Sequence, residues 1–89
     1  MTIQKYLMSK GIKPSLSGFS YLVMCVKICR SESLLKKPAK NLYELVAEKN
    51  GVTLSTVSKC ISYALEQADI ADTPMDFIVK ALIDLSEED

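Results

Sequence analysis

The chain has 89 residues, 48% of them hydrophobic, and its 11 basic and 11 acidic side chains give a formal net charge of zero. This length suits one domain, over residues 1–89, that buries a modest core without metal or disulfide support. The longest apolar run, residues 21–26, is far shorter than the roughly 20 residues that span a bilayer. The amino terminus lacks the marks of a secretion signal, and three cysteines, an odd number, fit a reducing compartment. We therefore expect a cytoplasmic protein with no membrane association.

Glycine, proline and aromatic residues are scarce, and no alternating apolar run predicts a strand. We therefore expect an all-α fold of about five helices, with a central helix-turn-helix and no β wing. The first helix is expected over residues 2–9, with Thr2 as its cap and Gly11 as its C-terminal stop. Its apolar face consists of Ile3, Tyr6 and Leu7.

A second helix is expected to start after Ser17. It is apolar around most of its circumference, which predicts a central position in the fold. Its apolar residues are Phe19, Leu22, Val23, Cys25, Val26, Ile28 and Cys29. Cys25 and Cys29 lie one helical turn apart, but the chain has no histidine and no second ligand pair. We therefore expect both cysteines to be small buried hydrophobes, and we expect no metal and no cofactor.

Residues 31–40, SESLLKKPAK, separate this helix from the next one. Pro38 disfavours a continuous helix, because proline removes a backbone donor and clashes with the preceding turn. Three lysines gather here: Lys36, Lys37 and Lys40. Because they precede the motif described next, we expect them to contact DNA phosphates, with an ordinary solvated surface as the alternative.

Residues 41–68, NLYELVAEKNGVTLSTVSKCISYALEQA, are typical of two helices joined at helix-turn-helix spacing, with the motif over about residues 41–67. Gly51 can take the left-handed conformation that ends the first helix. Ala47 is small, as the close crossing of two helix axes requires. The apolar residues expected to set the crossing angle are Val46, Val52, Val57 and Cys60.

The second helix of the motif is expected over residues 53–67, with Thr53 as its cap. The residues expected to face inward are Val57, Cys60, Ile61 and Ala64. Those expected to face outward are Ser55, Thr56, Ser58, Lys59 and Ser62. In a helix-turn-helix the first turns of this helix enter the major groove, where hydroxyls bond bases or phosphates and Lys59 can reach a guanine or a phosphate. Two alternatives stay open: a merely soluble helix face, and threonines that only satisfy backbone donors.

The last helix is expected over about residues 73–86. Thr73 is the predicted cap, Pro74 occupies the first turn, and Asp76 lies near the positive end of the helix dipole. The expected buried stripe consists of Phe77, Ile78, Ala81, Leu82 and Leu85.

Charge is distributed unevenly along the chain. Residues 1–59 contain ten basic and three acidic residues, 10 − 3 = +7, whereas residues 60–89 contain one basic and eight acidic residues, 1 − 8 = −7. A positive flank that carries the motif favours a polyanion, and the acidic half is expected to face away from it or to contact a protein. A solvated surface is the alternative for either cluster.

A family resemblance rests on three segments of the chain: IQKYLMSKGIKPSLSGFSYL, KNLYELVAEKNGVT and DFIVKALIDL. They resemble the opening, the scaffold helix and the last helix of the C-terminal effector domain of the stage 0 sporulation response regulator family. The matching residues include Gly18, Phe19, Tyr21, Leu22, Lys40, Leu42, Tyr43 and Ala47. The resemblance implies an all-helical domain that binds double-stranded DNA at short operators, as tandem copies in the family, and regulates transcription.

The chain also departs from this family. In the family, arginines and a glutamate of the recognition helix contact DNA. The matching residues here are Thr56, Ser58, Lys59 and Ser62, of which only Lys59 is basic. Operator specificity is therefore not carried over. GVTLSTVSKCIS is also similar to the recognition segment of lactose-repressor-type regulators, and residues 69–72 are too few for the extra helix that the sporulation family places before its last one.

The favoured function is that of a DNA-binding transcriptional regulator, which reads the major groove with residues 53–67. The alternative is a relative that has lost DNA affinity and acts as a protein-interaction module or as an antagonist of a regulator. An enzyme is not expected, because the chain has no histidine, no glycine-rich phosphate loop and no spacing that assembles a nucleophile with a base.

Overall fold

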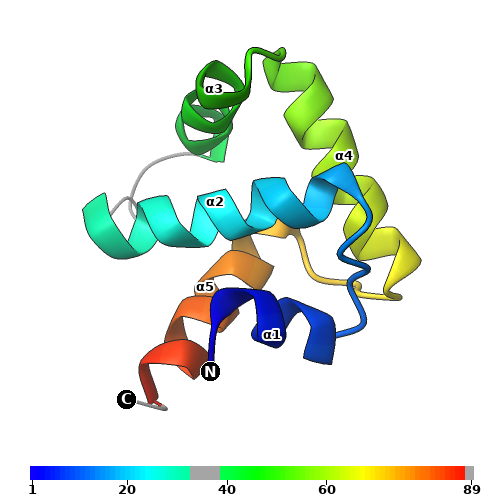
Figure 1. Cartoon of the computed structure of the whole chain (residues 1–89), viewed down its shortest axis with the longest axis vertical. Coiled ribbons are helices and arrows are strands. Elements are labelled where there is room, and N and C mark those ends of the chain that lie inside the picture. The colour runs from blue at the N-terminus through cyan, green and yellow to red at the C-terminus, as the bar shows by residue number, and fades with distance from the viewer. Residues whose placement is uncertain (33–38, 88–89) are drawn as a thin grey trace.

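In the computed structural model, which describes residues 1–32 and 39–87, the chain forms five helices and no strand (Figure 1). The helices are α1 (Ile3–Ser9), α2 (Ser17–Glu32), α3 (Ala39–Asn50), α4 (Leu54–Gln67) and α5 (Pro74–Glu87). The expected all-α fold with a central helix-turn-helix is therefore confirmed. No helix in the described ranges is long and apolar enough to cross a membrane.

Threonine side chains cap the amino-terminal ends of three helices, α1, α4 and α5. Each threonine Oγ1 accepts a hydrogen bond from the backbone N–H three residues later, over 3.1 to 3.2 Å: Thr2 from Lys5, Thr53 from Thr56, and Thr73 from Asp76. These bonds satisfy donors that have no partner within the first turn of a helix. The three caps predicted from the sequence are confirmed.

Left-handed residues end α1, α3 and α4. Gly11, Gly51 and Asp69 have φ angles of +91°, +64° and +57°. In each case the next residue donates its N–H to the carbonyl five positions earlier, over 3.0 to 3.1 Å: Ile12 to Leu7, Val52 to Ala47, and Ile70 to Leu65. This pattern is a Schellman motif, which satisfies the last carbonyls of a helix. The roles expected of the two glycines are confirmed, whereas Asp69 adopts the same conformation with a side chain present.

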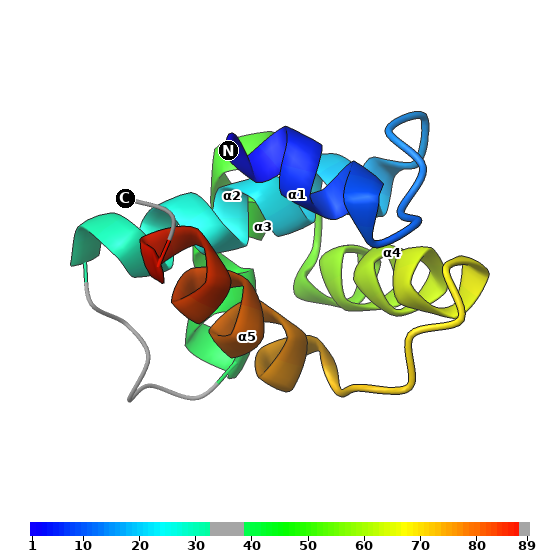
Figure 2. The ribbon, with the colours of Figure 1, turned by 90° about the horizontal axis from the view of Figure 1, so that it is seen from below.

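Helix α2 is the centre of the fold and packs against each of the other four helices. In Figure 1, α3 lies on one side of α2 and both α1 and α5 lie on the other, whereas α4 runs past the amino-terminal end of α2. Figure 2, seen from below, has α1 and α5 in front of α3. Leu22, Cys25 and Val26 of α2 have no exposed surface. Cys25 and Cys29 are buried free thiols, and burial raises the pKa of Cys25 to about 12. The central position of α2 and the burial of its cysteines were both expected from its apolar sequence.

Helices α2 and α4 cross at backbone contact, at Gly18. A Cβ atom at this position would lie 2.7 Å from the Ala64 Cβ and closer still to the Cys60 carbonyl oxygen. Real Cβ atoms do not approach their neighbours so closely, so only a residue without a side chain fits here. The first turn of α2 is therefore in direct contact with the middle of α4.

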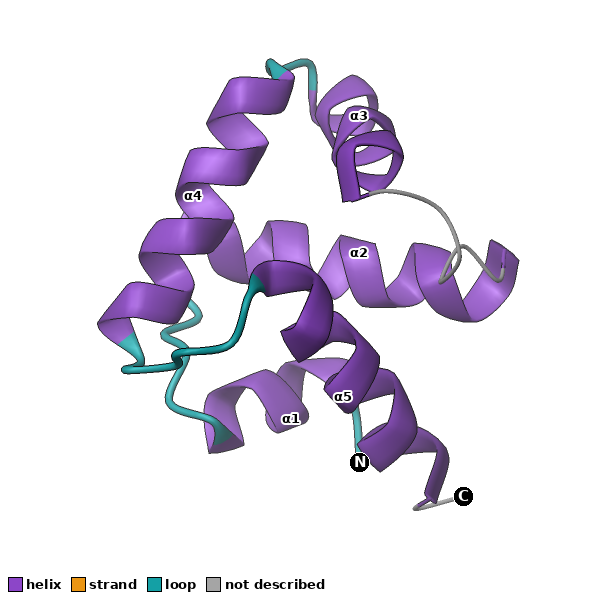
Figure 3. Cartoon of the chain, turned by 180° about the vertical axis from the view of Figure 1, so that it is seen from behind, coloured by secondary structure: helices purple, strands orange, loops and turns teal. Residues whose placement is uncertain are grey.

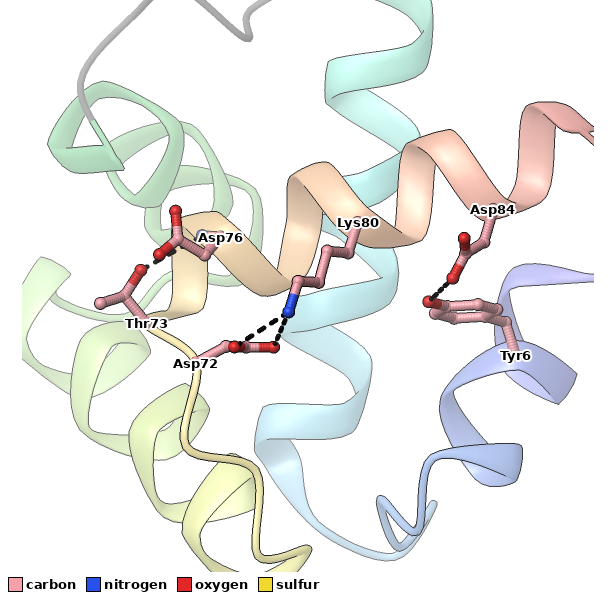
Figure 4. A network of polar contacts seen from close by, with 6 residues as sticks. All are labelled: Tyr6, Asp72, Thr73, Asp76, Lys80 and Asp84. Atoms are coloured by element: carbon pink, nitrogen blue, oxygen red, sulfur yellow. Dashed lines mark hydrogen bonds and ion pairs between the residues drawn. The ribbon is translucent and has the colours of Figure 1, made fainter.

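Helices α1 and α5 are joined by the side chain of Tyr6. Its hydroxyl donates a 2.6 Å hydrogen bond to Asp84 (Figure 4). Its ring lies against Phe77, with the ring centroids 6.4 Å apart. Burial raises the pKa of Tyr6, and the bond to Asp84 raises it further. Asp72, just before α5, forms a 3.0 Å ion pair with Lys80. The last helix is therefore tied both to the amino terminus and to its own preceding loop.

Some expectations differ from the structure in detail. Helix α2 includes Ser17, and α3 begins at Ala39, two residues before the predicted start. Cys60 and Leu82 are half-buried rather than buried. Cys60 borders a hollow beside the α2–α4 crossing, so one side of it is open. Residues 68–73 form turns and no helix, as their small number predicted.

Replacing Gly18 with alanine should lower the free energy of unfolding by about 2 kcal/mol, the middle of the range for overpacked cores. Helix propensity alone predicts the opposite sign, because glycine in a helix costs roughly 0.5–1 kcal/mol relative to alanine. Denaturant unfolding followed by circular dichroism measures the difference. The control is Ser20→Ala, an exposed site in the same helix. A Gly18→Ala variant as stable as the parent chain would show that the two helices do not meet at backbone contact.

Candidate nucleic-acid interface

Helices α3 and α4 form the helix-turn-helix (Figure 3). Three residues, 51–53, connect them, with Gly51 in the left-handed conformation and Thr53 as the cap of α4. Val46 of α3 and Val57 of α4 have no exposed surface, and Ala47 is 5% exposed. The two helices pack against each other, and both pack against α2. These three contacts fix the angle at which α4 projects from the domain.

Helix α4 is amphipathic. Its buried residues are Val57, Ile61, Ala64 and Leu65, of which the first three were expected and Leu65 was not. On the opposite side Ser55, Lys59 and Ser62 are exposed. These three residues follow one another at intervals of four and three, which places them in one stripe along the helix. The stripe formed by Ser55, Lys59 and Ser62 is here called the α4 stripe.

Thr56 and Ser58 do not face fully outward, contrary to the expectation. Both are half-buried. The Thr56 hydroxyl lies 2.9 Å from that of Thr53, and its backbone N–H is bonded to the same threonine oxygen. Ser58 borders a hollow that Tyr43 of α3 also lines. Thr53 therefore satisfies a backbone donor at the helix start, as one alternative had it, whereas the Thr56 hydroxyl meets the Thr53 hydroxyl instead. The periodicity of α4 alone did not show that Thr56 and Ser58 are partly covered.

Lys59 lies between two shallow hollows. The first, of about 450 Å³, is lined by Tyr43, Leu54, Ser55, Ser58 and Lys59. The second, of about 290 Å³, is lined by Leu16, Ser17, Gly18, Lys59, Cys60 and Tyr63. Lys59 is the one cation of α4, and the helix carries its one carboxylate, Glu66, two turns further on. The first turns of α4 therefore present hydroxyls and one positive charge to solvent.

Tyr63 is a candidate contact residue that the sequence reasoning missed. It is 51% exposed and lies four residues after Lys59, at the second hollow. An exposed aromatic residue with a hydroxyl can both stack against a sugar or base and donate to a phosphate. The spacing between Lys59 and Tyr63 was the available signal, since residues four apart are neighbours on a helix surface.

The predicted phosphate-binding lysines are only partly placed. Lys36 and Lys37 lie outside the described residues. Lys40 belongs to α3, but its side chain is outside the described part of the chain. Within residues 1–32 and 39–87 no group of three or more Cys, Asp or Glu side chains could hold a metal ion. Among the described residues, the hydrogen-bond donors of the candidate interface therefore include the serine hydroxyls and the Lys59 ammonium of α4.

A sequence model of the family described as "Sporulation initiation factor Spo0A C terminal" matches residues 3–81. The match begins at the first residue of α1 and extends into α5. No curated protein and no solved structure matches the chain.

Removing the cap of α4 should destabilise the helix that carries the candidate interface. Thr53→Ala is expected to lower the free energy of unfolding by about 1 kcal/mol, because the Thr56 N–H loses its acceptor. Ser62→Ala, at an exposed site of the same helix, should change it by less than about 0.5 kcal/mol. Urea titrations of both variants test this contrast, and equal losses would mean that Thr53 does not act as a cap.

Proposed function

The chain belongs to the family of the C-terminal domain of sporulation initiation factor Spo0A, a family of transcription-factor DNA-binding domains, and we propose that it reads double-stranded DNA by inserting α4 into the major groove. The α4 stripe carries this proposal. It lies on the helix that a helix-turn-helix presents to bases, and it starts in the first turn of that helix.

Different residues in and beside α4 are proposed to contact different parts of the DNA. Ser55, Lys59 and Ser62 are exposed and are proposed to meet base edges, where the Lys59 ammonium can donate to the O6 and N7 acceptors of guanine. Thr53 and Thr56 are at the helix start, where a hydroxyl or a backbone N–H meets a phosphate. Ser58 is half-buried, so its proposed role is a contact at the edge of the interface.

Phosphate contacts are proposed for the residues that flank the stripe. Tyr63 lies one turn beyond Lys59, where a recognition helix leaves the groove and approaches the backbone. Lys36, Lys37 and Lys40 precede or begin the scaffold helix, and their charge would release counterions from DNA. These contacts supply affinity without reading sequence.

One recognition helix with one cation supplies limited affinity, so a second copy on a tandem site is part of the proposal. Residues 1–89 would then act as one unit in the cytoplasm, with the acidic carboxyl end of the chain, after α4, turned away from DNA or toward a protein.

Selection of bound duplexes from a random DNA library at two salt concentrations tests the proposed function. An enriched motif is expected, with affinity that falls steeply as salt rises, since each neutralised phosphate contributes about −0.9 to the slope of log affinity against log salt. An enriched tandem repeat would support the second copy. No binding at low salt would reject DNA reading and favour the alternative, a relative that acts on proteins.

Lys59→Ala should cost about 1–3 kcal/mol on the selected duplex and relax the preference at one base position. Lys37→Ala and Tyr63→Phe should instead weaken selected and random duplexes alike, because phosphates are the same in both. Fluorescence anisotropy on the two duplexes measures this difference, with Lys5→Ala of α1 as the control. If Lys59→Ala weakened both duplexes equally, Lys59 would not be a base-reading residue.

A further inference from the structure

A second groove lies between α2 and α3, separate from the α4 stripe. It has a volume of about 360 Å³ and is lined by Met24, Lys27, Ile28, Ser31, Leu45 and Lys49. Helix α4 crosses α2 at Gly18, and Ile28 is ten residues further along the same helix, a distance of about 15 Å. The groove therefore has its own surface and needs no contribution from the α4 stripe.

The floor of the groove is apolar. Met24 and Leu45 are half-buried, and Ile28 is 8% exposed. Asn50 of α3 contacts Met24 in this floor, because its side-chain amide, which donates a 2.7 Å hydrogen bond to the Val46 carbonyl, also donates to the Met24 sulfur over 3.1 Å. A methionine beside branched aliphatic residues adapts to different apolar partners, as grooves that bind helices require.

The rim of the groove is basic. Lys27 on α2 and Lys49 on α3 are both exposed, and neither forms an ion pair with a described carboxylate. The carboxylates of α3, Glu44 and Glu48, are exposed but do not line the groove. An apolar floor between two cations is complementary to an apolar stripe bordered by anions. It is not complementary to DNA, which offers no apolar stripe of this kind on its backbone.

We infer that this groove binds an acidic amphipathic helix of a partner protein. Apolar residues at intervals of three and four would cover Met24, Ile28 and Leu45, and carboxylates on either side would face Lys27 and Lys49. This surface would let the domain engage a protein while α4 stays free.

Two synthetic helical peptides test the inference, with identical leucines at intervals of three and four and either glutamates or lysines beside them. NMR titration of the whole chain, labelled at methyl groups, is expected to shift Met24, Ile28 and Leu45 with the glutamate peptide only. Lys27→Glu combined with Lys49→Glu should weaken that binding about tenfold, because two exposed ion pairs are lost. The matched control, Lys5→Glu combined with Lys13→Glu, makes the same charge change at exposed sites outside the groove and should leave it unchanged.

Four results would overturn the inference. These are equal binding of the two peptides, no binding of the glutamate peptide, shifts of the same methyl groups on adding duplex DNA, and shifts that depend on protein concentration alone. The third result would assign the groove to nucleic acid, and the fourth to a second copy of the chain. Circular dichroism of the charge variants confirms that they are folded before either is compared.

Discussion

The close approach of α2 and α4 at Gly18 is the constraint on which the interface depends. Because no side chain intervenes, the Cys60 carbonyl and Ala64 of α4 rest directly on the first turn of α2. This contact settles which side of α4 is buried, and the α4 stripe is exposed as a consequence. A bulkier residue would push α4 outward and change the angle at which it projects from the α3 scaffold.

Local hydrogen bonds then set the length of α4. Thr53 begins the helix, and Asp69, in a left-handed conformation, ends it. The connection after Asp69 leads to α5, which the bond between Tyr6 and Asp84 ties to α1. Helices α1 and α5 thus both pack against α2, which in turn packs against α4. The α2–α3 groove shares no lining residue with the α4 stripe, so DNA and a protein helix could occupy the domain together.

Features encoded by near neighbours could be predicted from the sequence. The three threonine caps, the left-handed Gly11 and Gly51, and the amphipathic last helix each depend on a few adjacent residues. Features that depend on tertiary packing could not. The need for glycine at position 18 arises from Cys60 and Ala64, which lie more than forty residues away in the sequence. Asp69 supplies a turn for which a glycine is the usual signal. The family resemblance extended the sequence reasoning because it rests on three segments that together cover nearly the whole chain. The family match over residues 3–81 confirms the resemblance.

Whether the α4 stripe meets DNA is tested most directly by NMR titration of the ¹⁵N-labelled chain with a duplex taken from the random-library selection. The account predicts that the largest amide shifts occur at Ser55, Lys59 and Ser62, with smaller shifts at Tyr63 and little change in α5. Shifts confined to α2 and α5, with α4 unperturbed at saturating duplex, would contradict it and show that this helix-turn-helix does not read DNA through its second helix.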